Sequence, residues 1–376
     1  MSKLVLIVAR SGRQLAEAAN AGGYLPIVID FFGDTDTEAV CVANVVISPD
    51  TGLRFDPQRL LAALTTIRSG YGPMPLVWGS GWEGQPHLLA ALAQTWPTVG
   101  CQPGALFAVN DPRFFSQILC RSEIPHPSIA TGCVPTRGPW LLKRRGSCGG
   151  FGITRLGSRR FTGQREYLQR ELRGTHLSAA FLVGRNEVSV LGVCEAFNLQ
   201  PTDDLPFRFS AAVAAPRRFK GLQRPLTQVI ENLATSFALR GLCGIDFVVD
   251  ESGQLKVIEL NARPPATFDL LAERGHVFQA HMKSDTQAYG PIPIPEQIRA
   301  MAVCYAEHPL IVSKTLNWPD WVADRPRIGT ALSVGMPICS ITAAAATIDE
   351  SRKLLEQRFS LLMGEFKGPS RMSCLS

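Results

Sequence analysis

The sequence has no long hydrophobic run. Its 376 residues are 45% hydrophobic, yet no uninterrupted apolar stretch reaches the roughly 18 residues that a membrane span requires. This pattern excludes a transmembrane protein and argues against a membrane partner, and the apolar content excludes a largely disordered chain. At about 100–200 residues per domain, the length predicts two or three domains with an ample core.

Concentrated charge and paired cysteines are also missing. The 38 basic and 32 acidic residues give a net charge of +6, but no Lys/Arg run is long enough to bind nucleic acid. The ten cysteines are scattered, without a C-x-x-C pair, as in the reduced thiols of a cytoplasmic protein. The apolar stretch in MSKLVLIVARSGR is too short for a signal peptide and predicts a first β-strand. We therefore expect a cytoplasmic protein without a nucleic-acid partner.

The G-x-G-x-x-G fingerprint of dinucleotide sites is missing as well. The first apolar run continues as A-R-S-G-R, which disfavours a Rossmann-type oxidoreductase. The first hundred residues still predict a Rossmann-like α/β domain with a parallel sheet, because short apolar runs alternate with helical patterns. The apolar runs are residues 4–9, 25–30, 45–47 and 76–78, and the helical patterns are residues 14–21, 57–67 and 86–94.

A different pattern begins after residue 128. A helical stretch over residues 111–128 ends in IPHP, and short apolar segments joined by Gly- or Asp-containing turns follow. These segments predict a mostly antiparallel α+β region. The predicted strands are residues 140–143, 179–183, 188–193, 245–249 and 256–260, and a last helix is predicted over residues 349–363.

The first candidate site is the segment WLLKRRGSCGGFGI. An apolar strand leads to Lys143, and a loop with glycines at 146, 149, 150 and 152 follows. Such a loop brings backbone N–H groups close to phosphate oxygens, because glycine has no side chain to hold the anion away. Lys143 is the only lysine between Lys3 and Lys220, and it adds a point charge. The alternative is a flexible hairpin tip with a solvated lysine.

The second candidate site is the hairpin GLCGIDFVVDESGQLKVIELNARP. Two apolar strands flank the turn D-E-S-G. Pairing Val249 with Gln254 places Asp246 opposite Val257, diagonal to Glu259. The sequence therefore predicts that Asp246 and Glu259 lie within reach of each other across the ladder.

The hairpin also offers a set of oxygen ligands. Glu259 and Asn261 are two residues apart and project from one face of their strand. Carboxylates in apolar strands are costly to bury without a positive partner. Asp246, Glu259 and Asn261 therefore predict a Mg²⁺ site that is completed by substrate phosphates. The alternatives are an exposed sheet face or a buried salt bridge with Arg263.

These segments together resemble the ATP-grasp superfamily. The resemblance rests on a lysine with a Gly-rich loop, the connector in YLQRELRGTHLSAAFLV and the pattern D-F-V-V-D…V-I-E-L-N-A-R-P, in that order behind a Rossmann-like domain. By itself the connector reads as a structural linker. The resemblance implies α+β subdomains with antiparallel sheets that clamp ATP. It places a pre-ATP-grasp domain at residues 1–110, a lid subdomain at 111–175, a C-terminal ATP-grasp subdomain at 176–300 and a packed extension at 301–376.

The resemblance also implies roles for single residues. Lys143 contacts the ATP phosphates, and the loop with Gly146, Ser147, Gly149 and Gly150 covers them. Arg263 steadies an acyl phosphate, and Asp246, Glu259 and Asn261 hold Mg²⁺. The adenine-binding hinge and the polar position after it correspond to Gln169, Arg170, Glu171, Leu172 and His176.

The function that the resemblance implies is an ATP-dependent carboxylate–amine ligase that forms an acyl phosphate and releases ADP. Its substrates are a small carboxylate and an amino-acid-like amine. Homodimers are common in the family, and this is the basis for expecting one here. The rival readings are a catalytically weak ATP-binding regulatory or assembly protein, favoured by D-P-R at residues 111–113 where many members have a D-K pair, and a carboxylase that uses bicarbonate.

The tail resembles a narrower group. The run WPDWVADRPRIGT…GMPICSITA is similar to bacterial carboligase-like ATP-grasp proteins linked to tetrahydromethanopterin and methylofuran one-carbon metabolism. This likeness implies that an amino acid such as glutamate is added during biosynthesis of a one-carbon-carrier coenzyme. Alternatively, Trp318, Trp321, Asp324 and Arg325 form a Pro-rich surface loop that packs on the core.

Overall fold

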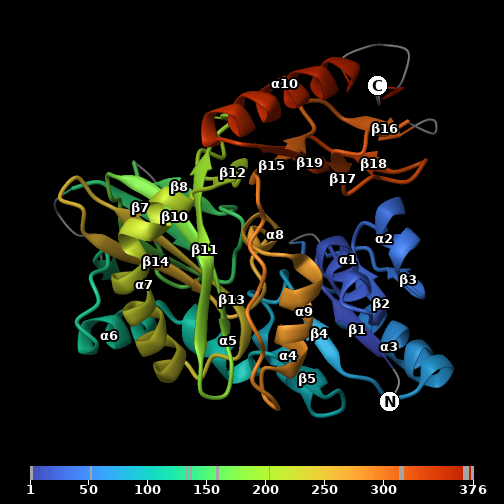
Figure 1. The fold of residues 1–376 in the computed structure, drawn as a ribbon, viewed down its shortest axis with the longest axis horizontal. Helices are drawn as coiled ribbons and strands as arrows, with labels where there is room; N and C mark the ends of the chain where they lie inside the picture. Colours follow the sequence, from blue (N-terminus) through green and yellow to red (C-terminus); the bar gives the residue numbers. More distant parts are fainter. Residues whose placement is uncertain are drawn as a thin grey trace.

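The computed structural model describes residues 3–50, 53–132, 134, 138–157, 161–202, 204–312, 317–366 and 372–373. Figure 1 shows the N-terminal α/β layer in blue, the central sheets in green and yellow, and the tail in orange and red above both. Among the helices that the structure describes, none has the length and apolar character of a membrane span.

The N-terminal region forms the predicted parallel sheet. Its order is β3-β2-β1-β4-β5, and the apolar residues of β1 from Val5 to Val8 are fully buried, as in a sheet covered on both faces. The strands are β1 (Leu4–Val8), β2 (Leu25–Asp30), β3 (Ala43–Val46), β4 (Leu76–Trp78) and β5 (Thr98–Val99). The helices are α1 (Arg13–Ala21), α2 (Thr35–Val40), α3 (Pro57–Tyr71) and α4 (Pro86–Ala93).

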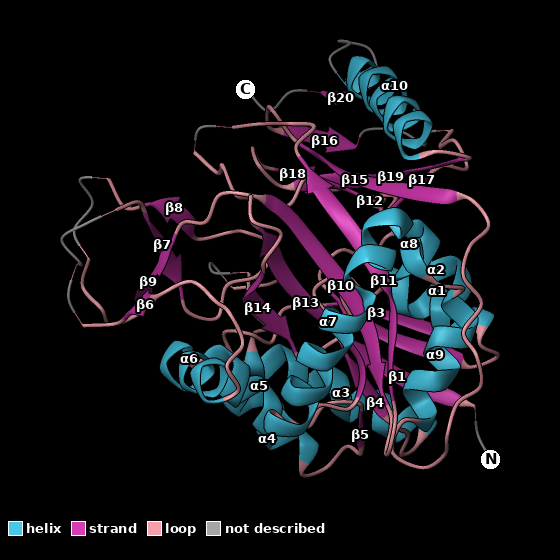
Figure 2. Ribbon diagram, turned by 60° about the vertical axis from the view of Figure 1, so that its left-hand side comes forward, coloured by secondary structure: helices cyan, strands magenta, loops and turns pink. Residues whose placement is uncertain are grey.

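A small antiparallel sheet follows two short helices. The helices are α5 (Pro103–Asn110) and α6 (Pro112–Arg121), and the sheet comprises β6 (Ile129–Ala130), β7 (Trp140–Arg144), β8 (Ile153–Arg155) and β9 (Glu166–Arg170). Its order is β6-β9-β7-β8, and it lies to one side of the large sheet (Figure 2). The glycine loop joins β7 to β8 and therefore extends from one end of this sheet.

The large sheet is antiparallel and has the order β14-β13-β10-β11-β12-β15-β19-β17. Its strands are β10 (Thr175–Val183), β11 (Val188–Phe197), β12 (Ala211–Ala214), β13 (Gly241–Val249), β14 (Leu255–Asn261), β15 (Ile298–Tyr305), β17 (Val322–Ala323) and β19 (Pro337–Ala345). Its helices are α7 (Pro216–Ser236), α8 (Phe268–Leu271), α9 (Arg274–Lys283) and α10 (Ile348–Phe366). The tail strands thus continue the sheet that carries the predicted metal ligands. A third sheet consists of β16 (Leu310–Val312), β18 (Ala331–Leu332) and β20 (Met372–Ser373).

The predicted register of the β13–β14 hairpin is wrong. Val249 pairs with Leu255, not with Gln254, and Asp246 pairs directly with Glu259. The register shifts because Ile258 is an extra residue, a β-bulge, between the partners of Asp246 and Phe247. The sequence pattern gave no sign of this bulge.

Candidate functional site

A pocket opens between the small sheet, strand β14 and the loop after β4. The described residues that line it come from β7, the glycine loop, β9 and β14, together with Glu83 and the α5–α6 region. The pocket brings together these predicted site residues: Lys143, Gly146, Ser147, Gly150, Gln169, Glu259, Asn261 and Arg263. Segments far apart in the sequence therefore converge on one space.

Lys143 lies at the centre of this pocket and is 5% exposed. The residues of strand β7 before it, from Trp140 to Leu142, are apolar. Its Nζ lies 3.3 Å from Gln169 Oε1 and 3.4 Å from Glu259 Oε2. Burial alone lowers the pKa of Lys143, but Tyr167 and Glu259 raise it above its ordinary value. Lys143 is therefore a fixed positive charge inside the pocket.

The bulge at Ile258 decides where the carboxylates face. Val257 belongs to the core and pairs with Phe247, whereas Glu259 pairs with Asp246 and lines the pocket. In a regular strand, residues 257 and 259 share a face, so without the extra residue Glu259 would turn toward the core. Gln169 Nε2 donates to the Ile258 carbonyl at 3.1 Å, which holds the bulge against β9.

Two carboxylates directly opposite each other repel. Burial and the neighbouring Glu259 raise the pKa of Asp246 to about 7, although Arg263, Lys143 and the Asn261 amide oppose the shift. Asn261 Nδ2 donates to Asp246 Oδ2 at 2.9 Å. A divalent cation would relieve this repulsion, so the donor set fits Mg²⁺, which takes one or two carboxylates plus phosphate oxygens. Over the described ranges, no group of three or more His, Cys, Asp or Glu side chains is placed to hold a metal ion.

Arg263 forms an ion pair that the sequence did not predict. Its Nε donates to Glu83 Oε1 at 2.6 Å, and both side chains are about nine-tenths buried. Glu83 Oε2 accepts from the Gly81 N–H at 2.8 Å, which orients the carboxylate. Glu83 lies in WGSGWEGQP, whose glycines and position after a parallel strand were the available signal.

The glycine loop is held between two other loops. A Cβ atom on Gly146 would lie 2.6 Å from the Gly84 Cα, and one on Gly150 would lie 1.8 Å from the Phe207 carbonyl oxygen. Both glycines have positive φ, a conformation that side chains disfavour. The Phe209 N–H also donates to the Gly149 carbonyl at 3.0 Å. Only glycine allows the backbones to approach this closely.

The remaining predicted residues are not part of the lining of the pocket. They are Gly149, Arg170, Glu171, Leu172, His176 and Asp246. The Arg170 guanidinium lies over the Trp140 ring, 5.8 Å from its centroid. Glu171 accepts from Arg155 at 2.8 Å. Asp246 lies beside the pocket through its partner Glu259.

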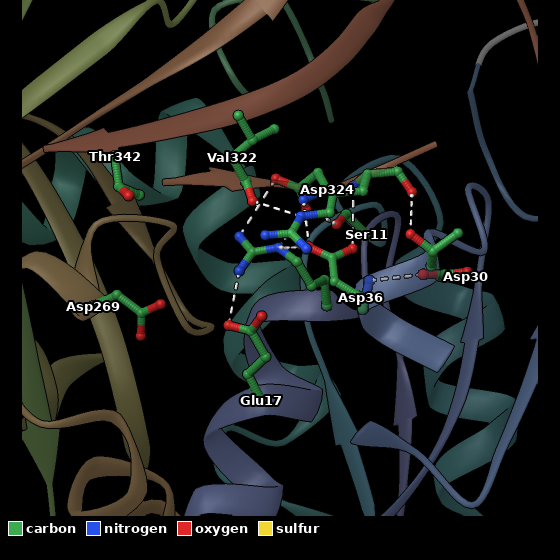
Figure 3. Close-up of polar contacts among 12 residues, drawn as sticks. Ser11, Glu17, Asp30, Asp36, Asp269, Val322, Asp324 and Thr342 are labelled. Carbon is green, nitrogen blue, oxygen red and sulfur yellow. Dashed lines mark hydrogen bonds and ion pairs between the residues drawn. The ribbon is translucent and has the colours of Figure 1, made fainter. Parts of the chain in front are cut away.

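A second polar cluster lies at the carboxyl ends of β1 and β2 (Figure 3). Arg13 Nε donates to Asp324 Oδ1 at 2.7 Å, and Arg13 also pairs with Glu17 at 2.9 Å. The Asp324 and Arg325 N–H groups donate to Asp36. This cluster fixes the tail to the N-terminal sheet.

The geometry agrees with the comparisons to known proteins. Residues 109–267 match the ATP-grasp domain family, so the chain carries an ATP-grasp domain. No curated protein matches the sequence. Solved structures of other proteins share the fold over the rest of the chain as well.

Three solved structures illustrate the shared fold. Biotin carboxylase from Campylobacter jejuni is 12% identical with a TM-score of 0.72, covering 96% of this chain and 95% of that one. L-amino acid ligase from Bacillus licheniformis is 12% identical with a TM-score of 0.70, covering 95% and 96%. N5-carboxyaminoimidazole synthetase from Staphylococcus aureus, solved with ADP, is 14% identical with a TM-score of 0.68, covering 96% and 99%. These three structures show that the shared fold extends over nearly the whole chain.

Proposed function

We propose that this protein is an ATP-dependent carboxylate–amine ligase that forms an amide and releases ADP and phosphate. The observation that supports this most is the convergence of Lys143, the glycine loop and the bulged strand with Glu259 on one pocket. This pocket lies largely within the segment that matches the ATP-grasp domain. The L-amino acid ligase shares the fold.

The proposed reaction has two steps. A substrate carboxylate oxygen attacks the γ-phosphorus of ATP, ADP leaves, and an acyl phosphate forms. The amine nitrogen then attacks the acyl carbon, phosphate leaves, and the nitrogen loses a proton. Both steps require charge neutralisation and alignment.

The residues of the pocket fit these requirements. Lys143 and the N–H groups of the loop with Gly146, Ser147, Gly149 and Gly150 bind the phosphates. Arg263, held by Glu83, stabilises the acyl phosphate. Asp246, Glu259 and Asn261 hold Mg²⁺, which neutralises phosphate charge when bound.

The adenine ring is proposed to bind beside the end of strand β9. Gln169, Arg170, Glu171 and Leu172 supply this segment, and His176 follows it. Gln169 lines the pocket, but its side chain already accepts a hydrogen bond from Lys143 and donates one to the Ile258 carbonyl. Recognition of adenine is therefore assigned to the backbone groups of the segment.

The finer proposal concerns the substrates. We propose that the amine is amino-acid-like, glutamate being one example, and that the product belongs to the biosynthesis of a one-carbon-carrier coenzyme. The likeness of the tail run that begins WPDWVADRPRIGT supports this. A homodimer is proposed on the family resemblance and a cytoplasmic location on the scattered cysteines without a C-x-x-C pair. Sedimentation of the purified protein tests the first of these.

The test is release of ADP and phosphate from Mg·ATP with a panel of amino acids and small carboxylates. Glu259→Gln is expected to lower substrate-dependent release by about 100-fold or more, because it removes a preorganised charge at the reacting phosphates. Glu231→Gln, on the exposed face of α7, is the matched control and keeps wild-type turnover.

Other outcomes would contradict the ligase. ATP binding with no turnover on any mixture favours the regulatory reading. Release that requires bicarbonate and no amine identifies a carboxylase. Absence of ATP binding overturns the assignment of this pocket.

A further inference from the structure

Two arginines lie close to one tyrosine where the N-terminal sheet, the glycine loop and the tail strands meet. Arg10 follows β1, Arg208 precedes β12, and Tyr305 ends β15. The Arg208 guanidinium stacks on the Tyr305 ring at 3.6 Å from its centroid. Burial raises the pKa of Tyr305 to about 12, and the charges of Arg208 and Arg10 partly oppose this rise.

Over the described residues, neither guanidinium group forms an ion pair with a carboxylate. Arg208 is only 7% exposed, and burial lowers its pKa from the ordinary value. The Nε of Arg10 is buried without a hydrogen-bond partner. A nearly buried cation without an ion pair is costly, so the Arg208 guanidinium, together with the half-buried Arg10, is suited to receive an anion.

The junction adjoins the reaction centre. Arg10 lies beside Gly81, where a Cβ atom would be 3.3 Å from the Arg10 Cβ. The Arg208 Cα would lie 2.9 Å from a Cβ on Gly150 of the glycine loop. Glu83, which pairs with Arg263, lies near Arg10. The Arg263 guanidinium is already paired with Glu83, whereas Arg10 and Arg208 have no ion pair with a described residue.

We propose that Arg10 and Arg208 bind a second anionic group of the substrate, a carboxylate or a phosphate, while its reacting carboxylate lies beside Arg263. The substrate class is then a dianion: a dicarboxylate or a phosphate-bearing carboxylate. Guanidinium groups bind either through paired, charge-assisted hydrogen bonds. The identity of the reacting carboxylate rests on the proposed ligase function, whereas the anion site does not.

The test measures binding without turnover. Succinate, inorganic phosphate and acetate are titrated calorimetrically into the full-length protein with Mg·ADP present, which occupies the nucleotide pocket. Succinate or phosphate is expected to bind, and the better of the two identifies the second group. Arg10→Gln and Arg208→Gln are each expected to weaken that binding about tenfold or more, since a hydrogen bond to a charged group is lost. Arg217→Gln, exposed on α7, leaves it unchanged.

The outcomes separate this inference from the ligase proposal. Binding that depends on both arginines without any ADP release supports the anion site and contradicts the ligase. ADP release with wild-type KM for substrate in both variants overturns the anion site alone. Binding that requires Lys143 but neither arginine places the anion in the nucleotide pocket and also overturns it. If Arg208→Gln does not fold, the less buried Arg10→Gln carries the same test.

Discussion

At the residue scale, one inserted residue determines the chemistry of the site. Ile258 shifts the β13–β14 ladder so that Glu259 faces Asp246 and Val257 stays in the core. Bulges commonly re-aim a side chain beside an active site. The same strand thereby serves the hydrophobic core and the proposed metal site.

A second feature at this scale is the buried carboxylate of Asp34. It is 4% exposed, and burial, followed by Asp324, Asp30 and Asp36, raises its pKa well above the ordinary value, although Arg13 opposes this. The folded protein therefore holds this proton to higher pH than the unfolded chain does. Ionisation of Asp34 thus costs stability above the ordinary pKa, and this cost vanishes below it.

Asp34→Asn is expected to stabilise the protein at about pH 8, because it removes this cost. The gain should shrink as the pH falls toward about 4, where the unfolded chain also binds the proton. Urea unfolding of the wild type and Asp34→Asn between about pH 4 and about pH 8 measures this gain in the free energy of unfolding. Asp34 occupies the N-cap of α2. Asp111→Asn replaces an N-cap aspartate that is exposed, before α6, and is therefore the control. A gain that is constant or grows at low pH would contradict the assignment.

At the element scale, the glycine loop between β7 and β8 joins the small sheet to its surroundings. Gly146 contacts the loop that carries Glu83, and Gly150 contacts the segment before β12. Water must be kept from an acyl phosphate until the amine arrives. We therefore expect opening and closing of Gly146–Gly152 to gate the reaction.

Gly150→Ala is expected to lower ADP release by up to about 100-fold, because displacement of a positioned group by about 1 Å can cost that much. The added Cβ would lie 1.8 Å from the Phe207 carbonyl oxygen. Gly253→Ala is the matched control, since Gly253 also has positive φ but no atom within 4 Å of its added Cβ. Equal losses of activity in the two variants would show that backbone strain, not contact, is responsible.

At the scale of the whole molecule, the Arg13–Asp324 ion pair ties the tail to the N-terminal sheet. The partners are 311 residues apart, and Arg13 is surrounded by Glu17, Asp36 and Asp324. Its side chain is 9% exposed. Loss of this one cation leaves several carboxylates without their partner.

Arg13→Gln is expected to lower the free energy of unfolding by about 3 kcal/mol, because a buried ion pair is broken on one side. Arg54→Gln breaks the exposed pair with Asp50, whose side chains are 50% and 29% exposed. That variant is expected to cost less than about 1 kcal/mol. Chemical denaturation of both compares them, and similar small losses would mean that the tail is held by its apolar contacts instead.

Helix α7 shows where local reasoning failed. Leu226, Ile230 and Leu233 form its buried face, the spacing of an amphipathic helix. Pro225 and Gly221 interrupt the pattern, and the sequence analysis did not predict this helix. Packing on the large sheet outweighs the cost of these residues, which propensity alone does not reveal.

The sequence by itself determined nine of the strands, from β1 to β4 and β7, β10, β11, β13 and β14, the main helices of the N-terminal sheet and the two motifs with Lys143 and Glu259. These depend on periodicity and turns that repeat over a few residues. Only the tertiary structure decided the bulge at Ile258, which Gln169 holds from 89 residues away, and the pair of Arg263 with Glu83, 180 residues away. The placement of Arg10 beside Gly81 and of Arg208 beside Gly150 is of the same kind. Contacts between distant residues depend on how sheets pack against one another, and no local pattern encodes that packing.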